Sequence, residues 1–190
     1  MPPNPSLVLR PLRWGDFDDL TNIYYRLYDE RSEGYPIGLT LFETRPSHAD
    51  EVRWFQGLFA ASVDGGAIVI VAEVEGRVVG SCTIRAGAHG GASEQSHVGE
   101  LGILVDRDHR GKGVGSALLE RALSDARSKF ELVYLSVFSV NEGARRLYER
   151  FGFAECGHLP KMVKRAGRYF DEERMVLDLA SVPATSRANR

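Results

Sequence analysis

The sequence predicts an α/β domain of mixed α+β character, built on a central mixed sheet with helices on its faces. One reason is that β-rich runs alternate along the chain with runs whose apolar residues recur at helical spacing. The other is that two β-rich runs stand side by side in the chain, around Glu75-Gly76, before the next helical run begins. Neighbouring runs that share a short Gly turn form a hairpin, so part of this sheet is expected to be antiparallel.

The first third of the chain is expected to hold one strand and two helices. Leu7 to Arg13 is predicted to be a strand, and Asp16 is predicted to cap the first helix. Residues 28–45 contain Gly and Pro and are expected to be irregular. Ser47 and Asp50 form an imperfect capping box for the second helix. Apolar positions recur three and four residues apart in both helices: Phe17, Leu20, Ile23, Tyr24 and Leu27, then Val52, Phe55, Leu58 and Phe59.

The middle of the chain is predicted to supply three strands. Ala67 to Val74 and Arg77 to Ile84 form the expected hairpin, with Glu75-Gly76 as its turn. Residues 86–95 are rich in Gly, Ala and Ser and are expected to form a loop. His97 to Val105 is then predicted to be a third strand.

The last third is predicted to alternate helices and strands. Val114 to Lys129 and Asn141 to Arg150 have helical spacing, and Gly152 is a suitable stop for the second of them. The alternating charges of residues 161–174 predict a solvated loop. The predicted strands of this part are Leu132 to Val137, Phe153 to Gly157 and Glu173 to Leu179.

Composition limits the class of protein. The chain has 190 residues, of which 43% are hydrophobic and 26% charged, which is typical of one globular domain and not of a disordered chain. Its net charge of -2 argues against a protein that binds nucleic acid through overall positive charge. No apolar run reaches the ~18 residues of a membrane span, and no signal-peptide pattern is present. We therefore expect a soluble cytoplasmic protein with a single domain over residues 1–180 and a disordered tail over residues 181–190.

Cysteine usage gives two further expectations. Cys82 and Cys156 are too few for a disulfide scaffold and fit a reducing compartment. They also lack the spacing of metal ligands, and no cluster of His, Cys and Asp stands near them, so no metal site is predicted.

The most informative segment is a strand that runs into a Gly-rich turn and then a helix, from Val105 to Leu118. The N-terminus of a helix carries unpaired N–H groups and about half a positive charge, and glycines let a phosphate approach that backbone. Arg110 and Lys112 add positive charge. The segment therefore predicts a phosphate site formed by Arg110, Gly111, Lys112, Gly113, Val114, Gly115 and Ser116.

Two common phosphate motifs do not fit this segment. The ATP-binding P-loop fails because Asp106 stands at its first Gly and Gly113 at its Ser/Thr position. The dinucleotide pattern fails because Ser116 replaces its third Gly. An ordinary helix N-terminus after a Gly-rich turn remains the alternative from the residues alone.

Two longer patterns resemble the GCN5-related N-acetyltransferase (GNAT) family. Arg110 to Gly115 matches that family's Gln/Arg-x-x-Gly-x-Gly/Ala signature, and Asn141 lies 26 positions after Gly115. The second pattern is Asn-x-x-Ala-x-x-Leu-Tyr-x-x-x-Gly-Phe, present as Asn141, Ala144, Leu147, Tyr148, Gly152 and Phe153. The segment Thr44-Arg45-Pro46-Ser47 with Trp54-Phe55, and the C-terminal end from Gly157 on, are similar to phosphinothricin and L-amino-acid acetyltransferases.

The resemblance implies a mostly antiparallel sheet that splays between its fourth and fifth strands, with acetyl-CoA bound at the opening. Backbone amides at Arg110 to Ser116 would hold its diphosphate, and backbone groups of Ile103 and Val105 would hold its pantetheine arm. Asn141 would contact the cofactor as well as cap its helix. Many relatives are homodimers, so a homodimer is expected by inheritance. Glu33, Tyr35 and Glu43 fall where the family builds its acceptor pocket, although exposed loop residues are the simpler interpretation.

Two residues are predicted to be catalytic. Acetyl transfer to an amine requires a base for the amine proton and an acid or other stabiliser for the leaving thiolate. Glu100 is the candidate base because it lies in the strand just before the phosphate loop, among apolar alternate positions where an unpaired carboxylate is costly. Its alternative is a Glu on a solvent-facing position of the sheet. Tyr148 is the candidate acid, and its alternative is a core tyrosine, since it lies on an apolar helix stripe.

The sequence thus favours an acetyl-CoA-dependent N-acetyltransferase. The expected acceptor is a primary amine of a small molecule, such as an amino acid or its analogue, which attacks the thioester directly in a ternary complex. Acetylation of a peptide or protein at its N-terminus or at Lys is the alternative within the class. A non-catalytic acetyl-CoA-binding module is the alternative of another class, and the presence of Glu100 and Tyr148 argues against it.

Overall fold

The computed structural model describes residues 6–32, 41–86 and 93–181. Its helices are α1 (Phe17–Ser32), α2 (His48–Val63), α3 (Val114–Ala126) and α4 (Glu142–Arg150), with single 3₁₀ turns at Trp14–Asp16 and Arg107–His109. Its strands are β1 (Leu7–Pro11), β2 (Ala67–Val74), β3 (Arg77–Ala86), β4 (Val98–Val105), β5 (Leu132–Phe138), β6 (Ala154–Arg165) and β7 (Arg168–Asp178).

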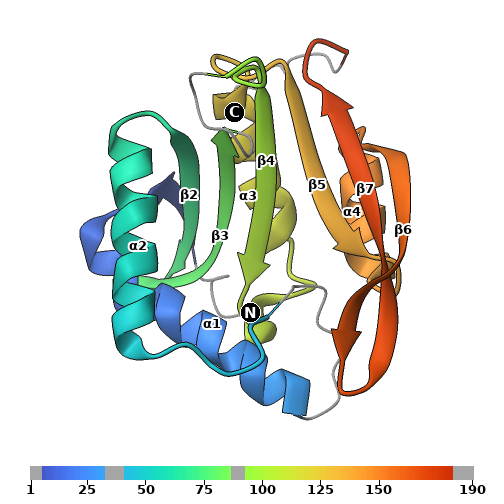
Figure 1. Cartoon of the computed structure of the whole chain (residues 1–190). Coiled ribbons are helices and arrows are strands. Elements are labelled where there is room, and N and C mark those ends of the chain that lie inside the picture. The colour runs from blue at the N-terminus through green and yellow to red at the C-terminus, as the bar shows by residue number, and fades with distance from the viewer. Residues whose placement is uncertain (1–5, 33–40, 87–92, 182–190) are drawn as a thin grey trace, which may run out of the picture.

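The described strands form one sheet in the order β1-β2-β3-β4-β5-β7-β6. Neighbouring strands are antiparallel except β4 and β5, which are parallel. That parallel pair is short, because only Val98 to Glu100 have register partners on β5, at Leu132 to Tyr134. Beyond these pairs the two strands diverge toward the end of β4 (Figure 1). The predicted mixed, mostly antiparallel sheet and its splay are confirmed.

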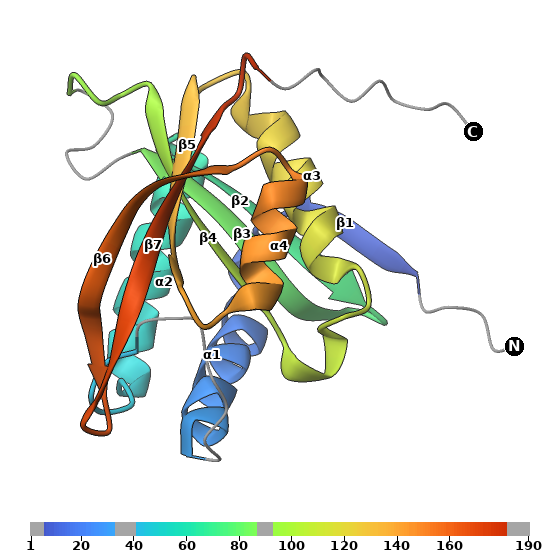
Figure 2. The ribbon, with the colours of Figure 1, turned by 90° about the vertical axis from the view of Figure 1, so that its right-hand side faces the viewer.

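Helices cover both faces of the sheet, as Figure 2 shows: α1 and α2 lie on one face, and α3 and α4 lie on the other. The larger core cluster joins α3 to the sheet through fully buried residues such as Leu118, Leu119 and Ala122. A smaller cluster under α2 includes Phe55 and Leu58. Burial of these apolar side chains, worth roughly 25 cal/mol per Å² removed from water, holds the helices on the sheet.

The C-terminal hairpin corrects the prediction of a solvated loop at residues 161–174. There β6 pairs with β7 around a turn at Ala166-Gly167, both of which have positive φ, as in the tight turns that fit the twist of a hairpin. Most of β6 is exposed, so its side chains show no apolar alternation that would mark it as a strand.

Three smaller expectations also need correction. α1 continues through Ser32, so the irregular segment does not begin at residue 28, and α3 ends at Ala126, short of Lys129. Asp16 lies inside a 3₁₀ turn, where its carboxylate accepts hydrogen bonds from the Arg13 backbone N–H and the Arg10 guanidinium. By contrast, the Ser47–Asp50 capping box is present at the start of α2.

No helix of the described residues combines the length and the apolar character needed to cross a membrane.

Candidate active site

The segment between β4 and α3 has the form of an anion-binding loop. Gly111 and Gly113 have φ of 72° and 85°, a left-handed conformation that glycine adopts without steric cost. A Cβ at either position would meet nothing within 4 Å, so these glycines are needed for backbone shape and not for space. Gly113 is the N-cap residue of α3, and no side chain caps this helix. The first N–H groups of α3, at Val114, Gly115 and Ser116, therefore point outward without an intrahelical acceptor.

Ion pairs from α1 hold this loop in place. The Arg110 guanidinium binds the buried Glu30 carboxylate through two contacts of 2.6 and 3.1 Å, and its Nε donates to the Val105 carbonyl at 2.9 Å. Arg26 binds Asp106 at 2.6 Å and Asp108 at 2.8 Å. The Arg110 side chain thus has a structural partner that the sequence did not reveal. Its contact with a cofactor stays a prediction, as do those of the rest of the loop.

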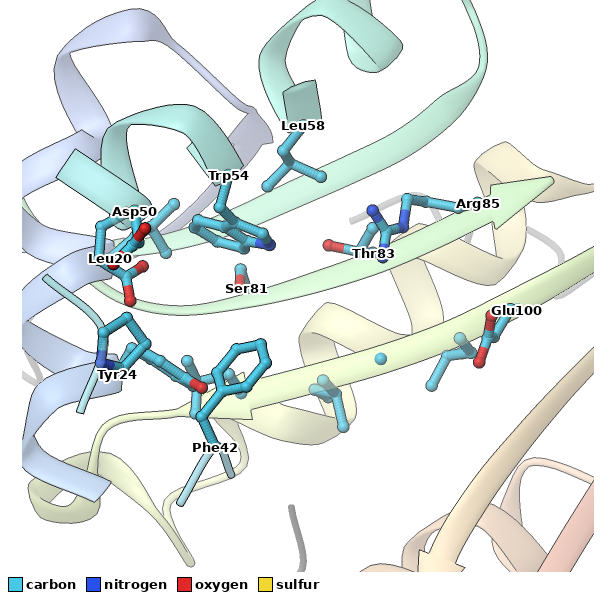
Figure 3. A pocket seen from close by; sticks show the side chains of 16 residues that line it. Leu20, Tyr24, Phe42, Asp50, Trp54, Leu58, Ser81, Thr83, Arg85 and Glu100 are labelled. Atoms are coloured by element: carbon cyan, nitrogen blue, oxygen red, sulfur yellow. The ribbon is translucent and has the colours of Figure 1, made fainter. Parts of the chain in front are cut away.

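A cavity of about 420 Å³ opens on the other side of β4, beneath α1 and α2. Its floor consists of Ser81, Thr83 and Arg85 of β3, which share a face because they lie two apart on the strand, and of residues 100–104 of β4. Figure 3 shows Trp54, Phe42 and Leu58 around the space between Asp50 at one end and Arg85 and Glu100 at the other. The polar side chains in its lining are those of Tyr24, Asp50, Glu51, Trp54, Ser81, Thr83, Arg85 and Glu100.

Glu100 lies in this cavity at the point where β4 and β5 part. It is the last residue of β4 with a register partner on β5, and that partner is Tyr134. Burial, the charge of Glu100 and a hydrogen bond to its carboxylate together raise the pKa of the Tyr134 phenol. Sequence reasoning missed Tyr134, although the alternation Val133, Leu135, Val137 in β5 already leaves Tyr134 on the opposite, less apolar face.

Tyr148 occupies the other face of the sheet. It is 6% exposed, belongs to the core cluster under α3, and packs its ring edge against Phe153 with centroids 5.8 Å apart. Burial, followed by the nearby Cys82 thiol, raises the pKa of its phenol, which therefore stays protonated at neutral pH. No hydrogen bond joins its hydroxyl to the described part of the chain. The structure does not bring Tyr148 into the lining of the cavity that contains Glu100.

The remaining predicted cofactor residues lie along that gap. Ile103 and Val105 follow Glu100 on β4 and have no register partner on β5, so β5 does not cover this stretch of backbone. Their side chains pack against the core on the α3 face. Asn141 caps α4, where its Oδ1 accepts from the Ala144 backbone N–H at 3.2 Å. That confirms its predicted role as a cap.

Of the weaker acceptor candidates, Glu43 is exposed, and Glu33 and Tyr35 lie outside the described residues. Within the described ranges, no three His, Cys, Asp or Glu side chains are grouped to hold a metal ion. Cys82 and Cys156 are both free thiols, the first buried and the second exposed.

Comparison with known proteins decides the family. The model of the acetyltransferase (GNAT) family matches residues 24–153, well over half of the chain. The chain belongs to this family. It is therefore an acetyl-CoA-dependent N-acetyltransferase, and the uncapped start of α3 with its two left-handed glycines fits the diphosphate of that donor.

Three similar proteins place this acetyltransferase more closely. It is 29% identical to the L-amino acid N-acyltransferase MnaT of Escherichia coli over 131 residues, which cover 68% of this chain and 73% of MnaT. A crystal structure of a putative phosphinothricin N-acetyltransferase is 27% identical with a TM-score of 0.78, covering 92% of this chain and 99% of that one. The fold also matches yncA of Salmonella typhimurium, solved with its cofactor acetyl-CoA, at 22% identity and a TM-score of 0.78, over 94% and 96% of the chains.

Proposed function

We propose that this acetyltransferase transfers the acetyl group of acetyl-CoA to the primary amine of a small molecule, an amino acid or an analogue of one. The observation that carries the proposal is the cavity of about 420 Å³ that ends at Glu100, where the sheet opens. That volume is in the range of roughly 300–1,000 Å³ typical of small-molecule sites. The similarity to MnaT supports an amino acid as the acceptor.

The donor would bind along the loop and the gap between β4 and β5. The outward N–H groups of Val114, Gly115 and Ser116 and the positive end of α3 favour a diphosphate, and the exposed Lys112 adds a cation beside them. Backbone groups of Ile103 and Val105, uncovered by β5, would hold the arm that follows. Acetyl-CoA supplies the acetyl group as a thioester and leaves as the thiol.

The acceptor would lie in the cavity with its amine toward Glu100. An alkyl amine is mostly protonated near neutral pH, with an ordinary pKa of ~10, so a base must take a proton before the nitrogen can attack. The Glu100 carboxylate, directly or through a water, would take it. Arg85 is the only Arg or Lys among the described residues of the cavity lining, and its guanidinium suits the carboxylate of an amino acid.

Tyr148 would complete the proton balance. The attack forms a C–N bond and breaks the C–S bond. The nitrogen loses a second proton as the amide forms, which would leave through Glu100 after the first has passed to solvent, and the departing thiolate needs one proton from another group. The Tyr148 phenol is protonated at neutral pH, because burial raises its pKa, so it can donate to the thiolate across the gap and regain a proton from solvent. Acetyl transfer is then direct, without an acyl-enzyme.

Release of the CoA thiol in the presence of acetyl-CoA and an amine panel tests this function. The panel should contain amino acids, polyamines, aminoglycoside-type amines, and peptides with a free N-terminus or Lys. Turnover that is fastest with a small amine supports the proposal, and turnover confined to peptides supports the alternative acceptor class. Binding of acetyl-CoA without turnover for any amine would indicate a binding module. The homodimer and the cytoplasmic location stay predictions, which light scattering and cell fractionation can test.

A further inference from the structure

The cavity has a second carboxylate, Glu51, that the proposed reaction does not use. Glu51 lies in the first turn of α2 and lines the cavity, yet it is only 4% exposed. Its neighbour Asp50 lies at the end of the cavity away from Glu100 and Arg85 (Figure 3). Glu51 is therefore carried by the turn of α2 at the far end of the site from the proposed base.

No hydrogen bond or ion pair satisfies Glu51 within the described part of the chain. Asp50 differs in this respect, because its carboxylate accepts from the Ser47 backbone N–H at 3.0 Å and from the Ser47 hydroxyl at 2.6 Å, and it binds Arg53. Burial, followed by the charge of Asp50, raises the pKa of Glu51, and a cation bound beside the carboxylate would offset both effects. A buried carboxylate without a partner normally costs stability, and its retention in a cavity wall is typical of a group that meets a ligand.

The other residues of the cavity lining indicate which chemical groups an acceptor needs. Tyr24 also lines the cavity, and the charge of Glu51 adds to the burial that raises the pKa of its phenol, so the two side chains lie near each other. Trp54, Phe42 and Leu58 give an apolar middle, which suits an alkyl chain, and Trp54 and Phe42 also offer ring faces to a cation. An acceptor that fits has an amine at one end, a chain of several carbons, and a second positive charge at the other end.

We propose that Glu51 binds a second cationic group of the acceptor, so that this enzyme prefers amines carrying a guanidinium or ammonium several carbons from the nitrogen that is acetylated. The proposal rests on the proposed function and names the class of its acceptor. A basic amino acid would meet three of the four charged side chains in the described lining of the cavity: its α-carboxylate would meet Arg85, its α-amine Glu100, and its side-chain cation Glu51, while the fourth, Asp50, is already bound to Ser47 and Arg53.

Two matched pairs of acceptors test this. Arginine and citrulline have the same shape, but only arginine carries the guanidinium charge. Agmatine and N-carbamoylputrescine repeat that comparison without the α-carboxylate. For the wild-type enzyme, kcat/KM should be about ten- to a hundredfold higher for the charged member of each pair, as expected for one charge-assisted contact in an apolar site. In Glu51→Gln the ratio should fall to about one, and in Glu51→Asp, which keeps the charge, part of the preference should return.

A control variant and a binding measurement separate selectivity from folding. Asp18→Asn removes one negative charge from an exposed residue of α1 and should keep the wild-type ratio. The Kd of acetyl-CoA should be the same in all these variants, because its proposed site is on the other side of β4. A ratio near one in the wild type, or an unchanged ratio in Glu51→Gln with acetyl-CoA bound normally, overturns the proposal.

The two acceptor pairs also show whether the role of Glu51 or the proposed function is wrong when one of them fails. If the enzyme acetylates agmatine but not arginine, and Glu51→Gln abolishes the preference over N-carbamoylputrescine, the role of Glu51 is supported and an amino acid acceptor is wrong. If none of the four compounds is acetylated while another small amine is, the role of Glu51 is wrong and the proposed function stands.

Discussion

Arg110 and Glu30 form a two-contact ion pair, at 2.6 and 3.1 Å, that joins α1 to the loop before α3. The residues are 80 positions apart, and Glu30 is almost completely buried. The same arginine donates to the Val105 carbonyl at the end of β4. The signature arginine therefore acts on the loop as a brace, and the shape of the anion site depends on α1, which also holds the loop through Arg26.

Glu30→Gln should weaken both folding and donor binding. Removing the charge of Glu30 deprives the Arg110 guanidinium of its carboxylate partner in a mostly buried pair, which should cost about 1–3 kcal/mol of unfolding free energy. The Kd of acetyl-CoA should rise several-fold, because the loop loses its brace. Urea unfolding and calorimetric titration measure the two effects. Glu142→Gln, which breaks an exposed pair with Arg146, is the matched control and should change stability by less than about 0.5 kcal/mol. Equal effects of the two substitutions would contradict the role of Glu30.

Gly113→Asp and Gly113→Asn separate charge from backbone shape at the start of α3. Asp and Asn have nearly the same size, and both tolerate the left-handed conformation that Gly113 adopts. The space beside Gly113 is open, so neither side chain should clash within the protein. Only Asp places a negative charge where the diphosphate is expected. The Kd of acetyl-CoA should therefore be about tenfold higher for Gly113→Asp than for Gly113→Asn. The same Kd for both variants would contradict the prediction that the diphosphate of acetyl-CoA binds at this loop.

Tyr148→Phe should reduce turnover with little effect on stability. The hydroxyl has no hydrogen-bond partner among the described residues, so its removal should cost about 1 kcal/mol or less. As the proposed acid it should be worth about a hundredfold in kcat. The raised pKa predicts that activity does not fall from ionisation of this phenol near pH 10, its ordinary range. Single-turnover kinetics with a thermal-unfolding control decide the matter, and an unchanged chemical rate would make Tyr148 a core residue only.

Tyr134→Phe tests whether the register partner of Glu100 fixes the proposed base. Loss of the phenol removes a hydrogen bond to the Glu100 carboxylate at the last paired position of β4 and β5. We expect kcat to fall about three- to tenfold while acetyl-CoA binds normally, since Tyr134 would act through Glu100. Ser136→Ala, two residues along the same face of β5, is the control and should have wild-type kcat. If both variants behave alike, Tyr134 does not position the base.

Local patterns in the sequence predicted most of the fold, because most of its helices and strands are marked by short-range features such as caps, turns and apolar spacing. The Ser47–Asp50 box, the Glu75-Gly76 turn and the cap at Asn141 are short-range features, and the structure contains all three. The outer ends of the β6–β7 hairpin overlap the strands predicted at Phe153 to Gly157 and Glu173 to Leu179, but the part nearer its turn was predicted to be a loop. Most of β6 is exposed there, which removes the apolar alternation on which strand prediction depends.

The site was predictable only in part, because its chemistry comes from long-range contacts. The loop around Gly113 carries its own signature, and Glu100 stands out by its neighbours on β4. Glu30 and Tyr134, by contrast, matter through partners brought by the fold from 80 and 34 residues away, and no spacing rule reveals such pairs. Glu51 is an ordinary acidic residue of a first helical turn until the structure shows that it is buried and lines a cavity.

Cys82 gives a prediction about pH and stability. Burial raises the pKa of its thiol from 9.0 to about 12, so the folded protein keeps the proton in a range where the unfolded chain loses it. The unfolded state then binds fewer protons, and the free energy of unfolding should fall as pH rises from about 9 toward 12, with the full contribution of Cys82 present below pH 9.

Between pH 8 and pH 10 the free energy of unfolding should fall by about 1 kcal/mol more in the wild type than in Cys82→Ala. The raised pKa values of Tyr24 and Tyr134 are common to both proteins and cancel in this difference, and so does the part of the Tyr148 shift that burial causes. Urea unfolding under reducing conditions at pH 8, 9 and 10 measures it. The Ala variant should be less stable throughout, because it leaves a cavity in the core. Parallel pH curves for the two proteins would mean that the Cys82 thiol does not titrate differently on unfolding.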